Sequence, residues 1–193
     1  MPTHAERRAA TREKLIEAAR EHFASNGYES THTNDILEQA GLSRGAMYHH
    51  FENKEALFEA VFVAVSDQTI ARATQVDRPI DSPLEHLIES CMAWLRAVRK
   101  PEIAAILLDQ GPMVLGWKRA RDLEAKTGLG LMQRSLEAAV VAGEVEVEST
   151  ELAARMINAL LAEAALATLY KQPRVSIAKQ ESLLRAFISG LTI

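Results

Sequence analysis

Residues 44–51 combine side chains that could contact nucleic acid with small residues that would let a helix approach it closely. Met47 and Phe51 are four residues apart, so on a helix both face the same side and would pack into a core. The opposite side then holds Arg44, Gly45, Tyr48 and His49. Arginine pairs with guanine through two hydrogen bonds, and tyrosine donates to phosphates. The pattern predicts a helix that enters a DNA groove.

The residues just before this segment predict the element that would position it. Asp35 to Ala40 indicate a short helix whose core face carries Ile36 and Ala40. Gly41 would end that helix, because glycine adopts the left-handed C′ conformation without steric cost. Ser43 would cap the next helix by accepting a hydrogen bond from a free backbone N–H group. Together these features predict a helix-turn-helix motif at about residues 32–51.

The composition favours helices throughout the chain. Its 193 residues, 48% of them hydrophobic, can bury the core of one or two domains. Nine glycines and 5% aromatic residues, among many Ala, Leu, Glu and Arg, are typical of helical proteins. The brief alternation at residues 143–148 is too short to predict a strand. We therefore expect an all-α fold.

The same composition bears on the cell compartment. No run of about 18 apolar residues predicts a membrane span. The N-terminal residues lack the apolar segment of a secretory signal. The single cysteine, Cys91, has no partner for an intrachain disulfide, which fits a reducing environment. We expect a cytoplasmic protein that does not associate with membranes.

The charge of the N-terminal segment does not by itself favour DNA binding. Residues 1–54 hold seven Lys or Arg and eight Asp or Glu, a formal charge of −1, whereas DNA-binding domains are usually basic. The placement of charge is uneven, however. Basic residues cluster at the front of the chain, and five of the six histidines precede residue 55. The motif, rather than the net charge, supports DNA binding.

Turn and capping residues divide the remainder into further helices. Gly111-Pro112 is expected to close a short helix, and Thr127 to Gly130 to bend a longer one. The expected helices cover about residues 5–25, 35–40, 44–50, 53–76, 83–99, 101–110, 114–126, 131–142, 150–170 and 176–191.

The N-terminal third resembles the TetR family of transcriptional regulators. The resemblance covers about residues 12–62, and residues 107–118 also look like a stretch in some members' C-terminal domains. The matching features are Leu15-Ile16-(x)2-Ala19-(x)3-Phe23, Asn26-Gly27-Tyr28, Asp35-Ile36, Ala40-Gly41-Leu42-Ser43 and Tyr48-His49-His50-Phe51-(x)2-Lys54-(x)2-Leu57.

The resemblance implies which residues contact DNA. Tyr48 and Lys54 fall where members contact phosphates, and His49 is a further candidate for the backbone. Base edges would meet Arg44, Gly45 and Ala46, and the start of the preceding helix would contribute Thr31, Thr33 and Asn34. Two positions depart from the family pattern: His32 replaces a small hydroxyl residue and Leu37 replaces alanine. We expect His50 to be a packed structural residue.

The C-terminal segment supplies candidate walls for a small-molecule pocket. Such pockets are mostly apolar with a few polar groups. The apolar candidates are Cys91, Trp94, Met113, Trp117, Met132 and Met156. Asn158 and Glu163 are candidate polar groups; alternatively, they reach solvent or pair at an interface.

The last two helices are candidates for a homodimer interface. Residues 151–170 are rich in alanine, which permits close helix approach, and residues 176–191 add large apolar side chains. Two such helices can form half of a four-helix interface with a second subunit. Ordinary packing within the chain would explain the same pattern, but the resemblance implies the dimer.

These observations predict a helix-turn-helix DNA-binding domain at residues 1–54 and a larger ligand-binding and dimerisation domain at residues 55–193. The predicted function is a ligand-responsive transcriptional regulator. The resemblance implies a repressor that binds a near-palindromic operator as a homodimer and is released by a small, largely apolar effector. The alternative is a helical small-molecule-binding protein without sequence-specific DNA recognition. We find no residue pattern that predicts catalysis, a cofactor or a metal site.

Overall fold

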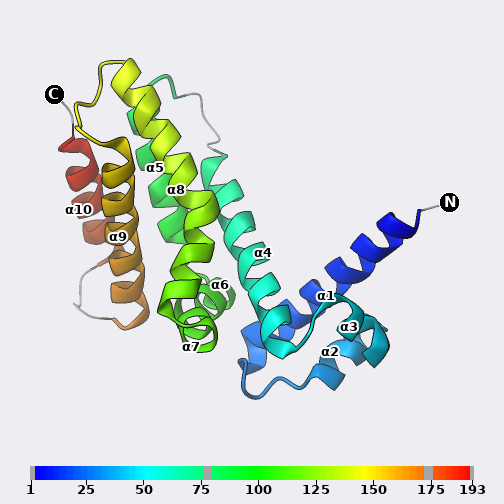
Figure 1. Cartoon of the computed structure of the whole chain (residues 1–193). Helices are drawn as coiled ribbons and strands as arrows, with labels where there is room; N and C mark the ends of the chain where they lie inside the picture. Colours follow the sequence, from blue (N-terminus) through cyan, green and yellow to red (C-terminus); the bar gives the residue numbers. More distant parts are fainter. Residues whose placement is uncertain (1–2, 76–79, 172–175, 192–193) are drawn as a thin grey trace. The chain divides into compact units, whose positions relative to one another are not determined.

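The computed structural model describes residues 3–75, 80–171 and 176–191, and within these ranges every regular element is a helix (Figure 1). This confirms the predicted all-α fold. The chain forms two compact units, Met1–Ser66 with Pro101–Ala120 and Asp67–Lys100 with Arg121–Ile193. The functional boundary at residue 54 stays a prediction.

The first unit contains α1 (His4–Asn26), α2 (Thr33–Ala40), α3 (Arg44–His50) and the beginning of α4 (Lys54–Thr74). Its core includes the fully buried residues Leu15, Phe23, Ile36, Met47 and Phe58. The rings of Phe23 and Phe58 meet edge to face with their centroids 5.2 Å apart. The helices of the predicted motif are therefore held on α1 and α4 by a shared apolar core.

Local capping fixes the ends of these short helices. Gly41 ends α2 in the left-handed conformation, at φ 64° and ψ 37°, and the N–H group of Leu42 donates to the Leu37 carbonyl. The Ser43 hydroxyl accepts from the Ala46 N–H group at 3.2 Å, as predicted. At the start of α1, Thr3 and Glu6 form a capping box in which each side chain accepts from the other's N–H group.

Residues 101–115 differ from the sequence expectation. Gly111-Pro112 does not close a helix there. Instead α6 (Pro101–Ala104) continues as a π-helical segment, η1 (Ala105–Gln110), and then as α7 (Gly111–Leu115). Proline is tolerated because it sits in the first turn of α7, and the break falls at Gly116, where φ is +78°. Gly111 is required because a Cβ atom at this position would collide with the Phe62 ring.

The second unit contains α5 (Pro83–Ala97), most of α8 (Trp117–Val141), α9 (Thr150–Leu169) and α10 (Ile177–Ser189). Helix α5 packs against α9 and α10, which also contact each other. Arg185 on α10 pairs with both Glu85 and Glu89 on α5. These contacts fix α9 and α10 as a pair on one side of α5, which Figure 1 shows side by side.

The expected bend at residues 127–130 is also wrong, because α8 runs without interruption through them. Glycine within a helix costs about 1 kcal/mol relative to alanine. Tertiary contacts outweigh that cost here: Gly128 lies beside Ile70, and the Thr127 hydroxyl donates to Asp67 at 2.8 Å. The predicted end of this segment at Gly143 is confirmed by its φ of +71°.

Helix α9 has 20 residues with a mean hydropathy of 1.4, so its length and composition alone would suit a membrane-spanning helix. Its buried face, including Ile157 and Leu161, packs within the helical domain, and it carries Glu151, Arg155 and Glu163. The expectation of no membrane span therefore depends on packing rather than on hydropathy.

Candidate nucleic-acid interface

Helix α3 has one buried and one exposed face, as its sequence predicts. Met47 is fully buried, whereas the Tyr48 side chain is 52% exposed. Arg44, Gly45 and His49 are exposed as well, and Ala46 is half-buried. An Arg, a Tyr and a His therefore project from a helix that is fixed from behind by the core. This arrangement suits insertion into a major groove.

Gly45 has no evident role in folding. Its backbone is helical, and a Cβ atom built on it would meet only the Ser43 hydroxyl, at 3.9 Å. Glycine at an exposed helical position costs about 1 kcal/mol relative to alanine. Packing within the protein therefore does not require glycine at position 45. Close approach of another molecule to α3 would require it.

The start of α2 leaves backbone donors available. The preceding residue His32, within the described range 3–75, makes no side-chain hydrogen bond to the helix start. Asn34 is exposed and Thr33 is half-buried, so both lie beside these donors. Helix N-termini attract anions through their free N–H groups and the helix dipole. Because His32 replaces a small hydroxyl residue, α2 has no capping side chain. Its start can still bind a phosphate through the backbone N–H groups.

Thr31, one of the residues predicted to contact DNA, has its side chain inside the protein. Thr31 is 1% exposed, and its hydroxyl is directed at the carbonyl oxygens of Gly27 and His22, at 2.7 and 3.2 Å. A hydroxyl satisfied inside the protein has no proton left for a phosphate. Thr31 instead holds the loop between α1 and α2 in place. Its neighbour Thr33, two residues along, retains exposure.

Lys54 has a structural role that the sequence did not reveal. Its ammonium group donates to the carbonyl oxygens of Tyr28 and Thr31, at 2.8 and 3.2 Å. The same group lies 4.1 Å from the centre of the Tyr28 ring, a cation–π contact. An ammonium group has three donors, so one remains for a phosphate. Lys54 thus ties α4 to the loop that precedes α2.

A small cleft lies between the start of α1 and the end of α3, both in the first unit. Its volume is about 270 Å³. The cleft is lined by His4, Arg7, Arg8, Thr11, His49 and His50.

His50 differs from the expectation of a packed structural residue. It is half-buried, lines this cleft, and its ring centroid lies 5.3 Å from that of His49. Burial lowers the pKa of His50, and the nearby His49, Arg8 and Arg12 lower it further. The sequence signal for this site was the clustering of basic residues and histidines before residue 55.

The predicted pocket residues are divided between the two units. Met113 and Trp117 belong to the first unit and are 76% and 58% exposed; the other six belong to the second. There Cys91 is buried, which raises the pKa of its thiol to about 12 and keeps it protonated. Met156 and Glu163 are exposed on α9, and the remaining three are half-buried: Trp94, Met132 and Asn158.

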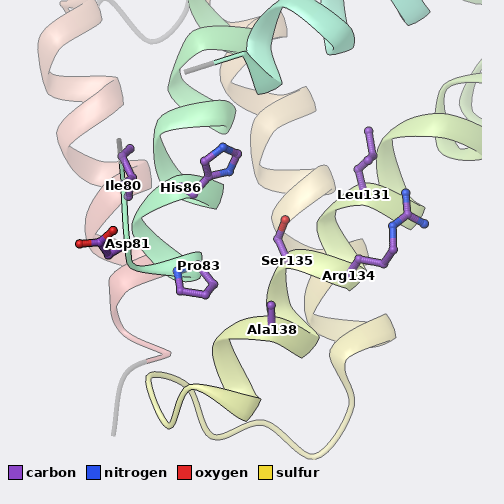
Figure 2. A pocket seen from close by; sticks show the side chains of 8 residues that line it. All are labelled: Ile80, Asp81, Pro83, His86, Leu131, Arg134, Ser135 and Ala138. Carbon is purple, nitrogen blue, oxygen red and sulfur yellow. The ribbon is translucent and has the colours of Figure 1, made fainter. Parts of the chain in front are cut away.

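A groove of about 340 Å³ in the second unit has a different lining from the predicted one (Figure 2). It lies between the start of α5 and the C-terminal half of α8. Its described lining residues are Ile80, Asp81, Pro83, His86, Leu131, Arg134, Ser135 and Ala138. Apolar side chains thus line the groove together with the polar residues Asp81, His86, Arg134 and Ser135, and small-molecule sites combine these two kinds of group. The sequence missed them because helical periodicity does not say which turns border a hollow.

Glu124, on α8, is a further unusual group in the second unit. Burial raises its pKa to about 7, and Arg121 opposes part of that effect. Its carboxyl group is therefore partly protonated near neutral pH.

Helices α9 and α10 carry large apolar side chains on their exposed surfaces. Leu152 and Met156 lie one turn apart on α9 and are 58% and 62% exposed. Leu183 and Phe187 lie one turn apart on α10 and are 59% and 55% exposed. Exposed apolar surface of this kind marks sites of protein association.

The fold and the α3 surface define an all-helical, helix-turn-helix DNA-binding protein. Two sequence models agree: residues 15–61 match "Bacterial regulatory proteins, tetR family", and residues 84–191 match "Tetracyclin repressor-like, C-terminal domain". The chain belongs to the TetR family of transcriptional regulators, which confirms the resemblance.

Individual relatives agree with this assignment. The chain is 31% identical to the HTH-type transcriptional regulator UidR of Escherichia coli over 134 residues, 60% of this chain and 67% of UidR. A TetR-family regulator from Pectobacterium atrosepticum is 29% identical, with a TM-score of 0.84 over 100% of this chain and 98% of the other. The structure of RolR with resorcinol shares the fold at 20% identity, with a TM-score of 0.75 over 98% of this chain and 90% of RolR.

Proposed function

We propose that this regulator is a homodimeric repressor that reads a near-palindromic operator and releases it when a small molecule binds. The observation that carries the proposal is the exposed face of α3. Arg44, Tyr48 and His49 project from a helix whose Met47 is fully buried, and Gly45 leaves space for close approach. Arg44 reads a base edge, while Tyr48 and the start of α2 hold phosphates.

The dimer forms through α9 and α10. Their exposed apolar residues, Leu152, Met156, Leu183 and Phe187, are covered by the same helices of a second copy. A twofold axis relates the two α3 helices and places them in successive major grooves, about 34 Å apart or somewhat more. Operator symmetry follows from that axis.

The effector binds in the C-terminal domain. The groove with Leu131, His86 and Arg134 is a candidate site, in addition to the pocket residues predicted from the sequence. A relative of the same fold, RolR, holds resorcinol, which supports small-molecule binding by this architecture. An effector weakens DNA binding only by the difference in its affinity for the DNA-bound and released conformations.

The test is selection of genomic fragments by the purified protein at near-physiological salt. We expect the wild type to enrich a palindromic site. Arg44→Ala/Tyr48→Ala should lose that enrichment, whereas the exposed pair Lys100→Ala/Lys126→Ala should keep it. Enrichment by the Arg44→Ala/Tyr48→Ala variant would contradict the assignment of α3. A protein that enriches nothing, with or without effectors, would favour a small-molecule-binding protein instead.

A further inference from the structure

The cleft between α1 and α3 is built from one face of α1. His4, Arg7, Arg8 and Thr11 follow the spacing 3, 1 and 3, so their side chains lie together along two turns of the helix. They face His49 and His50 at the end of α3, so the cleft adjoins the helix that carries Arg44 and Tyr48.

The lining is suited to an anion. Every described residue that lines the cleft is basic or carries a hydroxyl group. The nearest acidic residue in the sequence, Glu6, has its carboxylate bound to the Thr3 N–H group in the capping box. Arg12 adds a further cation beside the cleft, 5.2 Å from the centre of the Phe51 ring. Burial is the main cause of the lowered pKa of His50, and the nearby His49, Arg8 and Arg12 lower it further, as positive charges do.

The first turns of α1 lie outside the matched part of the family's DNA-binding model, which begins at residue 15. The formal charge of −1 on residues 1–54 conceals this local concentration of cations. When a helix enters a DNA groove, the sugar–phosphate backbone lies beside that helix. Positive charge at this position would therefore attract the backbone.

We propose that this cleft binds a backbone phosphate of duplex DNA, so that α1 and the end of α3 hold the strand beside the groove that α3 enters. Arg7 and Arg8 donate to the phosphate oxygens, and His49 and His50 close the other side. The proposal rests on the proposed function for its ligand. It predicts a phosphate contact that contributes affinity but no base preference.

The experiment measures the salt dependence of binding to the selected operator and to a random duplex of equal length. Arg7→Gln/Arg8→Gln should flatten the slope of log K against log salt by about one unit per bound protomer. Affinity should fall by a similar factor on both duplexes, about tenfold per protomer near 0.1 M salt. The preferred base sequence should not change.

Two controls isolate the cleft. Lys100→Gln/Lys126→Gln removes the same charge from exposed positions in the second unit and should leave the slope unchanged. Arg7→Lys/Arg8→Lys restores the charge and should recover most of the slope. The proposal would be overturned if the salt slope of Arg7→Gln/Arg8→Gln equalled that of Lys100→Gln/Lys126→Gln.

The two proposals fail in different ways. If the wild type prefers no sequence but Arg7→Gln/Arg8→Gln weakens its binding to random duplex, operator reading fails and the cleft stands. If operator enrichment persists and the variant binds random duplex as the wild type does, only the cleft fails. A wild type that binds neither duplex overturns both.

Discussion

The ammonium group of Lys54 lies 4.1 Å from the centre of the Tyr28 ring and donates hydrogen bonds to the carbonyl oxygens of Tyr28 and Thr31. One side chain therefore links the first residue of α4 to the loop that sets the start of α2. The sequence predicted only a phosphate contact for Lys54, but this residue also stabilises the first unit.

Replacement of Lys54 by alanine should affect both stability and DNA binding. Loss of the cation–π contact and of two hydrogen bonds should lower the free energy of unfolding by about 1–2 kcal/mol. If the third N–H group reaches a phosphate, the salt slope should also fall by about one unit per protomer. Urea denaturation and DNA titrations at several salt concentrations would separate the effects. Unchanged stability would contradict the structural role.

Gly45→Ala should stabilise the protein and weaken DNA binding. The added methyl group has space in the free protein and should raise the free energy of unfolding by up to about 1 kcal/mol. The same methyl group would obstruct close approach to DNA. Gly128→Ala is a matched control, because Gly128 is also helical and its Cβ would meet Ile70 at an ordinary 3.5 Å. Equal DNA affinity in both variants would argue against a role for Gly45 at the groove.

DNA binding should strengthen as the pH falls from about 7 to about 5.5. Burial and neighbouring cations hold the pKa of His50 below its usual 6.5, so it is largely neutral in the free protein at pH 7. A bound phosphate would raise that pKa, and binding would take up a proton. His50→Gln should therefore show a weaker pH dependence than the wild type. An identical dependence would remove His50 from the site.

Phe187→Glu should disrupt the dimer. A carboxylate at this exposed apolar position would be buried against the second copy without a partner. Analytical ultracentrifugation should show monomers for Phe187→Glu and dimers for the wild type. Val141→Glu, at a position that is 89% exposed on α8, should remain dimeric. A dimeric Phe187→Glu protein would place the interface elsewhere.

Features that depend on residues close together in the sequence could be predicted from the sequence. Gly41 and Ser43 set the turn of the motif by local hydrogen bonds, and both act as expected. Gly111 and Gly128 misled the prediction, because tertiary packing keeps their segments helical. The internal bonds of Thr31 could not be foreseen either, since the two carbonyls that it meets come from the end of α1 and the loop that follows.

The candidate sites show the same limit. The spacing of the cations from Arg7 onward was visible, but their position beside His49 depends on how α1 packs against α3. Apolar and sulfur-containing residues suggested a pocket, but their sequence pattern does not show that Met113 and Cys91 belong to different units. Composition indicates which residues are suited to line a cavity, whereas tertiary packing determines which residues line it.

The capping box at the start of α1 affects the thermodynamics of association. Thr3 and Glu6 satisfy each other's N–H groups, so the turn that leads to Arg7 and Arg8 is already ordered. Ordering a residue's backbone costs about 1–2 kcal/mol in conformational entropy. A frayed helix end would incur that cost for each residue fixed on the DNA. The capped end avoids it, so the attraction between the arginines and a phosphate is retained as binding free energy.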